Sequence, residues 1–134
     1  MGPFQAALNA PGSFQWTDES STATIPRNIP LRVSWSGGDP NSVVAIVGLS
    51  VDPTGNYAAV FTCTEKVGAA SFVVPQYVLS WLPANSIATG ILAVNDLVQS
   101  RFSAPGLDAG YFNYQVGAAR NVQYTGPALK ASPK

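Results

Sequence analysis

The sequence of 134 residues contains no histidine and a single cysteine, Cys63. Without histidine, neither a Ser-His-Asp nor a Cys-His catalytic set can form. Histidine is also the usual nitrogen ligand of zinc, and this chain has none to offer. A lone cysteine cannot form a disulfide within the chain, and on an apolar strand it is expected to pack as a small core residue. These absences argue against the common nucleophilic hydrolases and against a zinc site.

Charge is scarce as well. Charged residues make up 10% of the chain, and seven basic residues balance seven acidic ones. Such a surface has no long-range field that would attract nucleic acid or anionic lipid. Long apolar runs are also missing, because the longest, Val43 to Val51, is interrupted by Gly48 and Ser50 and is far shorter than the ~20 residues of a membrane helix. We therefore expect no nucleic-acid partner and no membrane insertion.

The sequence does contain short apolar or alternating runs, separated by turn residues about every ten positions. Leu31 to Trp35 alternates apolar with polar residues, which predicts a strand with one buried face. Val43 to Leu49 is apolar at nearly every position, which is typical of a strand covered on both faces. The pattern predicts an all-β, antiparallel sandwich of about seven to nine strands. One short helical turn is expected near residues 76–82.

The distribution of these turn residues also predicts how the chain is divided. Residues 1–13 are predicted to be a flexible or edge-lying lead-in, residues 14–125 a single domain, and residues 126–134 a loose tail. Within the domain, Asn95-Asp96 is predicted to be a turn after the strand Ile91 to Val94. The last two strands, Tyr111 to Val116 and Asn121 to Thr125, are predicted to form a hairpin around residues 117–119.

The carboxylates lie nearly all in turn sequences such as GGDPN, VDPTGN and VND. Aspartate in these settings usually bonds to its own backbone. Calcium is the best metal candidate, with Asp39 and Asp52 among its possible ligands, but the spacing matches neither an EF-hand nor a DxDxDG loop. A glycosidase-like carboxylate pair is the corresponding catalytic alternative. Because turn chemistry accounts for these residues, we expect no catalytic residue, metal or cofactor.

Aromatic residues provide a further candidate site. Trp81 and Tyr77 flank the predicted helical turn, and Trp16 lies on the first strand. Exposed aromatic faces of this kind could stack on sugar rings and form a carbohydrate-binding platform. Core packing is the competing interpretation, and it suits Trp35, which shares a face with Leu31 and Val33.

Three segments carry a resemblance to a known family: LRVSWSGGDPNSVVAIVG, FTCTEKVGAASFVVPQYVLSWLP and ILAVND. Together they are similar to an uncharacterised immunoglobulin-like module of large secreted or surface proteins of soil bacteria. The matching patterns lie at Trp35 to Gly38, Phe61 to Thr64 and Phe72 to Pro83, within residues 31–96. The resemblance implies an immunoglobulin-like β-sandwich and an extracytoplasmic setting. The family has no assigned activity, so it supplies no catalytic residues.

These observations predict a non-catalytic structural or interaction module of a larger exported bacterial protein. Its partner would be another domain of that protein, a second protein or a surface polysaccharide. A carbohydrate-binding module that uses Trp81, Tyr77 and Trp16 is the first alternative, and an enzyme with an Asp/Glu pair is the second. The first residues, MGPFQAALNAPG, lack the basic start and apolar run of a signal peptide.

Overall fold

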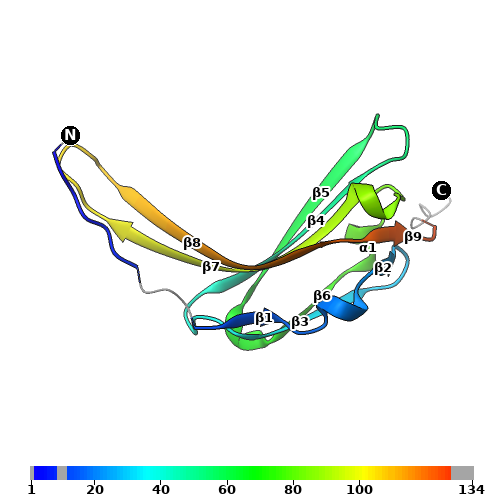
Figure 1. Cartoon of the computed structure of the whole chain (residues 1–134), viewed down its shortest axis with the longest axis horizontal. Coiled ribbons are helices and arrows are strands. Elements are labelled where there is room, and N and C mark those ends of the chain that lie inside the picture. Colours follow the sequence, from blue (N-terminus) through cyan, green and yellow to red (C-terminus); the bar gives the residue numbers. More distant parts are fainter. Residues whose placement is uncertain (1, 9–11, 128–134) are drawn as a thin grey trace, which may run out of the picture.

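A computed structural model describes residues 2–8 and 12–127 of the chain. The protein is mostly β, with antiparallel sheets, one short parallel strand pair and few helical residues (Figure 1). The predicted all-β class is therefore confirmed. No helix among the described residues is long and apolar enough to cross a membrane.

Two antiparallel sheets enclose the core. The smaller has the order β1-β3-β6 and the larger the order β5-β4-β7-β8. The strands of the smaller sheet are β1 (Phe14–Trp16), β3 (Leu31–Gly37) and β6 (Ser71–Val74). Those of the larger sheet are β4 (Val43–Val51), β5 (Ala58–Lys66), β7 (Gly90–Phe102) and β8 (Gly110–Asn121). A separate parallel pair joins β2 (Thr24–Pro26) to β9 (Gln123–Thr125).

The core is built from one face of each large strand. Val33 and Trp35 point inward from β3, and Val44 and Ile46 point inward from β4. Because side chains alternate along a strand, each of these residues leaves its neighbours on the opposite face of the sheet. Cys63 is half-buried and packs against this core, as a small apolar residue would.

The predicted helical turn is confirmed as α1 (Gln76–Leu79). Leu79 and Leu82 are fully buried and anchor the segment against the core. Among the described residues, three short 3-10 turns complete the helical content, at Glu19–Ser21, Val67–Ala69 and Ile87–Thr89.

Two predicted turns in the second half of the chain are wrong. Asn95-Asp96 lies inside the continuous strand β7, and residues 117–119 lie inside β8. The hairpin forms instead between β7 and β8, with Phe102 paired to Gly110. Local turn propensity is overridden here because Asp96 is satisfied by groups of another loop, and Gly117 packs directly against the backbone of Val94 and Asn95.

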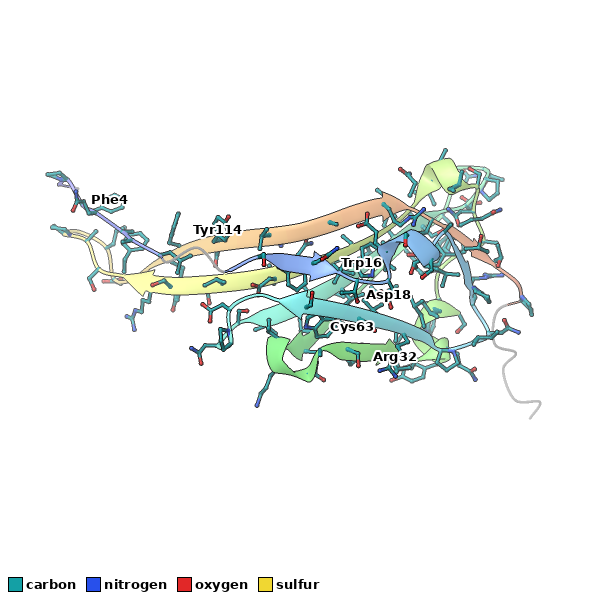
Figure 2. The ribbon with its side chains drawn as sticks, turned by 60° about the horizontal axis from the view of Figure 1, so that its bottom comes forward. Phe4, Trp16, Asp18, Arg32, Cys63 and Tyr114 are labelled. Atoms are coloured by element: carbon teal, nitrogen blue, oxygen red, sulfur yellow. The ribbon has the colours of Figure 1, made fainter. Side chains whose placement is uncertain are left out.

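The β7–β8 hairpin extends beyond the rest of the larger sheet as a two-stranded arm. β4 pairs with β7 only as far as Leu97, whereas β7 and β8 stay paired to Phe102. Residues 2–8 lie near this arm, and Phe4 stacks on Phe102 with ring centroids 5.2 Å apart. Figure 2 shows Phe4 and Tyr114 on this part of the molecule, away from Trp16 and Cys63.

Part of the predicted domain division falls outside the described residues. This applies to residues 1 and 9–11 of the predicted lead-in, and to residues 128–134 of the predicted tail. The division itself therefore stays a prediction.

Candidate functional site

The side of the larger sheet that faces away from the core is apolar and uncovered. We call this surface the outer face. The strand register places Val60, Leu49 and Ile91 side by side across β5, β4 and β7. Val60 is 63% exposed, and Ile91 is exposed as well. The larger apolar side chains of the outer face are Val43, Val47, Leu49, Val51, Val60, Ile91 and Leu97.

Small and uncharged residues fill the rest of the outer face. Thr62, Val47, Ala93 and Ala119 form one cross-strand row, and Asn95 and Gly117 are neighbours in the next. Among the described residues of this face, two carry a charge: Lys66, at one corner beside Val43, and Arg101, on the arm opposite Tyr111. Neighbouring exposed apolar side chains that form a contiguous patch are typical of interaction sites.

The smaller sheet provides an internal comparison. Its outward residues include Gln15, Arg32, Ser34 and Ser71, with Val73 as an exposed apolar exception. This sheet has the polar exterior expected of a strand layer that faces water. The two exteriors therefore differ in character although both sheets pack on the same core.

The prediction that Val43 to Leu49 is covered on both faces is wrong for the described chain. Val44 and Ile46 are fully buried, but Val43 is 40% exposed, and Val47 and Leu49 are only half-buried. Of the outward residues of this run only Ala45 is buried, at 4% exposure, whereas the larger side chains remain partly open to solvent. The apolar residues on both sides of this run are the sequence signal for the outer face. By itself, this pattern predicts burial within the fold and does not distinguish it from an exposed interaction surface.

The three predicted aromatic site residues separate into two groups. Trp16 is 3% exposed, so its predicted place in a sugar platform is wrong. It lies opposite Trp35 in the β1–β3 pair, which directs both rings into the core. Its indole Nε1 donates a hydrogen bond to Asp18 Oδ1 at 2.6 Å.

Trp81 and Tyr77 are exposed, at 73% and 62% respectively. They project from the α1 segment while Leu79 and Leu82 hold it to the core. Tyr57 joins them, since it is exposed and its hydroxyl donates to the Trp81 carbonyl at 3.2 Å. Among the described residues, the stacked aromatic pair is Phe4 with Phe102, so Trp81 and Tyr77 do not form a stacked pair.

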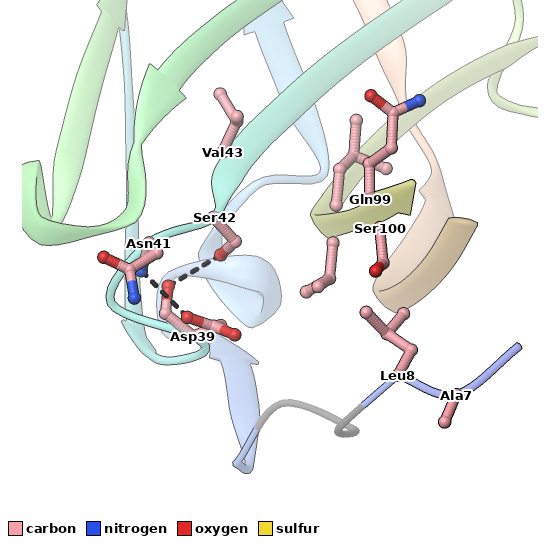
Figure 3. A pocket seen from close by; sticks show the side chains of 10 residues that line it. Ala7, Leu8, Asp39, Asn41, Ser42, Val43, Gln99 and Ser100 are labelled. Atoms are coloured by element: carbon pink, nitrogen blue, oxygen red, sulfur yellow. Dashed lines mark hydrogen bonds between the residues drawn. The ribbon is translucent and has the colours of Figure 1, made fainter. Parts of the chain in front are cut away.

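A hollow of about 490 Å³ lies where the arm leaves the larger sheet (Figure 3). Ala7 and Leu8 line one side, β7 residues another, and the turn at residues 39–43 a third. Within that turn, the Asn41 N–H donates to Asp39 Oδ1 at 2.8 Å, and the Ser42 hydroxyl donates to the Asp39 carbonyl at 2.7 Å. These hydrogen bonds tie the polar groups of the turn to one another.

Two further aspartates, Asp52 and Asp96, have structural roles. Hydrogen bonds from the Thr54 hydroxyl and the Tyr57 N–H lower the pKa of Asp52, which closes its own turn. Asp96 is fully buried and accepts hydrogen bonds from the Ser42 hydroxyl and from the Asp39 N–H at 3.1 Å. The described residues contain no cluster of three or more His, Cys, Asp or Glu side chains suited to a metal ion.

Cys63 is poorly placed to act as a nucleophile. Burial raises the pKa of its thiol, which keeps it protonated at neutral pH.

Comparison with protein-family models, with curated proteins and with solved structures gave no match to this chain. The outer face is therefore the candidate site that the geometry itself supports.

Proposed function

We propose that this chain is a non-catalytic interaction module of a larger exported bacterial protein, and that it engages its partner through the outer face. The observation that carries the proposal is the contrast between the two exteriors. The smaller sheet is polar outside, whereas the larger sheet has Val60, Leu49 and Ile91 in one row. Burying such a row contributes about 25 cal/mol per Å² of apolar surface removed from water.

We further propose that the module has the immunoglobulin-like sandwich architecture. In that architecture, strands A, B and E share one sheet, and strands C, F and G share the other. The orders β1-β3-β6 and β5-β4-β7-β8 agree with this division when β1, β3 and β4 are matched to strands A, B and C. The extracytoplasmic setting rests on the sequence resemblance and on the low charge.

Hydroxyl-radical footprinting tests the interaction role. The chain alone in dilute solution is compared with the same residues in the complete exported gene product. We expect oxidation at Val60 and Ile91 to fall severalfold in the complete product, because a partner shields the outer face from solvent. Val73, exposed on the smaller sheet, is the matched control and should be oxidised equally in both. Equal oxidation of Val60 in the two preparations would contradict the role.

Carbohydrate binding is a second candidate function, favoured by the exposure of Trp81 and Tyr77 beside Tyr57. A glycan array probed with the wild-type chain and with Trp81→Ala tests it. If the candidate is correct, the chain binds at least one glycan, and Trp81→Ala weakens that binding about tenfold because a stacking face is lost. Failure to bind any glycan, or equal binding by the variant, would exclude these residues as a sugar platform.

A further inference from the structure

We propose that the partner of the outer face is a second copy of this chain, which packs its own larger sheet face to face about a two-fold axis. This inference rests on the proposed function, because it names the partner of the same surface. Three properties of the outer face support a copy of the chain as its occupant: its charge, its shape and its area.

The first property is the lack of charge. In a two-fold interface both copies contribute the same surface. A charged surface would therefore face charges of the same sign on the other copy, and the two would repel. The two charged residues of the outer face lie at its periphery, Lys66 on the edge strand β5 and Arg101 on the arm, beyond the part of β7 that pairs with β4. The remaining polar positions of the outer face are uncharged, and they include Thr62, Asn95 and Gln115. The chain as a whole has no net charge, so two copies do not repel at long range.

The second property is shape. Strands in a sheet twist steadily relative to one another, which gives the sheet the shape of a saddle. The height of such a saddle above its mean plane is proportional to the distance along the strands multiplied by the distance across them. A rotation by 180° about the strand direction changes the sign of the height and also the sign of the distance across the strands. Because the two changes cancel, the rotated sheet has the same saddle shape as the original. A twisted sheet is therefore complementary to its own copy under such an axis, and sheets packed in this way are common within sandwiches. β4 and β7 occupy the centre of the larger sheet, where the axis would lie.

The third property is area. Strands lie about 4.8 Å apart and alternate residues about 6.8 Å apart, so four strands and the five outward positions of β4 span on the order of 600 Å². Two copies would together bury roughly 1,200 Å², the lower end of the range for specific protein interfaces. Weak, reversible complexes are found at this end of the range, so we expect a dimer in reversible equilibrium with the monomer.

Sedimentation velocity of the isolated chain, from low micromolar to near-millimolar concentration, tests the proposal. We expect a monomer–dimer equilibrium. Val60→Lys and, separately, Ile91→Lys should each raise the dissociation constant by about tenfold or more, because two-fold symmetry places two ammonium groups in an apolar interface. Val73→Lys is the matched control: Val73 is also an exposed valine on an edge strand, but on the smaller sheet. It should leave the constant unchanged.

Several results would overturn the second copy as partner. These are a wild-type chain that stays monomeric throughout, a dimer that is insensitive to both outer-face substitutions, and a dimer that Val73→Lys weakens as much. Growth beyond the dimer without saturation would contradict two-fold closure. Circular dichroism and the urea midpoint confirm that each variant is folded. If the chain is monomeric but its outer face is shielded in the exported gene product, this inference fails while the proposed function stands.

Discussion

Replacing Trp35 with alanine is expected to lower the free energy of unfolding by about 4 kcal/mol. Trp35 is 3% exposed at the end of β3, and its indole Nε1 donates to the Val67 carbonyl at 2.9 Å. The substitution removes a large buried ring and leaves a cavity between the two sheets. It also leaves the Val67 carbonyl without its indole donor, which adds to the cost. Small domains have only about 5–15 kcal/mol of stability in total, so the loss is large.

Urea unfolding followed by tryptophan fluorescence and circular dichroism measures this effect. Trp81→Ala is the matched control, because Trp81 is the same residue type but largely exposed. Its effect should stay within about 0.5 kcal/mol. Similar losses for the two variants would mean that Trp35 is not a core residue, and the assignment of the two sheets to one core would then be wrong.

The second large effect is expected at Asp96. Asp96→Ala should cost about 3 kcal/mol, because it removes the acceptor of the Asp39 N–H and the carboxylate that shares the Ser42 hydroxyl with the Asp39 carbonyl, and leaves a cavity at a fully buried position. The turn that holds these donors is also constrained by Gly38, whose φ is +89° and whose absent Cβ would lie 2.9 Å from Asp96 Oδ2. The carboxylate of β7 therefore holds the β3–β4 turn against the larger sheet.

Two measurements separate this role from a general loss of stability. Urea unfolding gives the energetic cost, and amide hydrogen exchange should show faster exchange at the Asp39 N–H in Asp96→Ala under native conditions. Asp108→Ala is the control, since Asp108 is exposed in the β7–β8 turn, and its effect should lie within about 0.5 kcal/mol. Unchanged protection at Asp39 would show that the turn does not depend on Asp96.

Asp96 also illustrates the limit of sequence interpretation. The tripeptide VND has ordinary turn chemistry, and nothing local distinguishes it from the turn at Asp52, which is correctly predicted. The difference is the loop that contains Asp39 and Ser42, more than fifty residues earlier in the chain. A residue whose hydrogen-bond partners are remote cannot be assigned from its neighbours.

The aromatic candidates show the same division. The sequence predicts a place in a sugar platform for both Trp16 and Trp81, each of which follows a polar residue. Trp16 is buried because antiparallel pairing sets it opposite Trp35. Trp81 is exposed because Leu79 and Leu82 take the inward positions of its segment. Alternation along β3 predicted the burial of Trp35 without help from tertiary structure, since Leu31 and Val33 share its face.

The sequence by itself determined the all-β class, the inward face of β3, the helical turn at α1 and the absence of a histidine-based active site. Each follows from residue identity or from a period of a few residues. Tertiary structure alone decided that β7 and β8 run on as a long hairpin, that Asp96 is buried, and that the outer face of β4 is left uncovered. The apolar run Val43 to Leu49 shows why. Its residues show that both faces of the strand are apolar. Only the arrangement of the other strands decides which of the two faces the described residues bury and which they leave exposed for a partner.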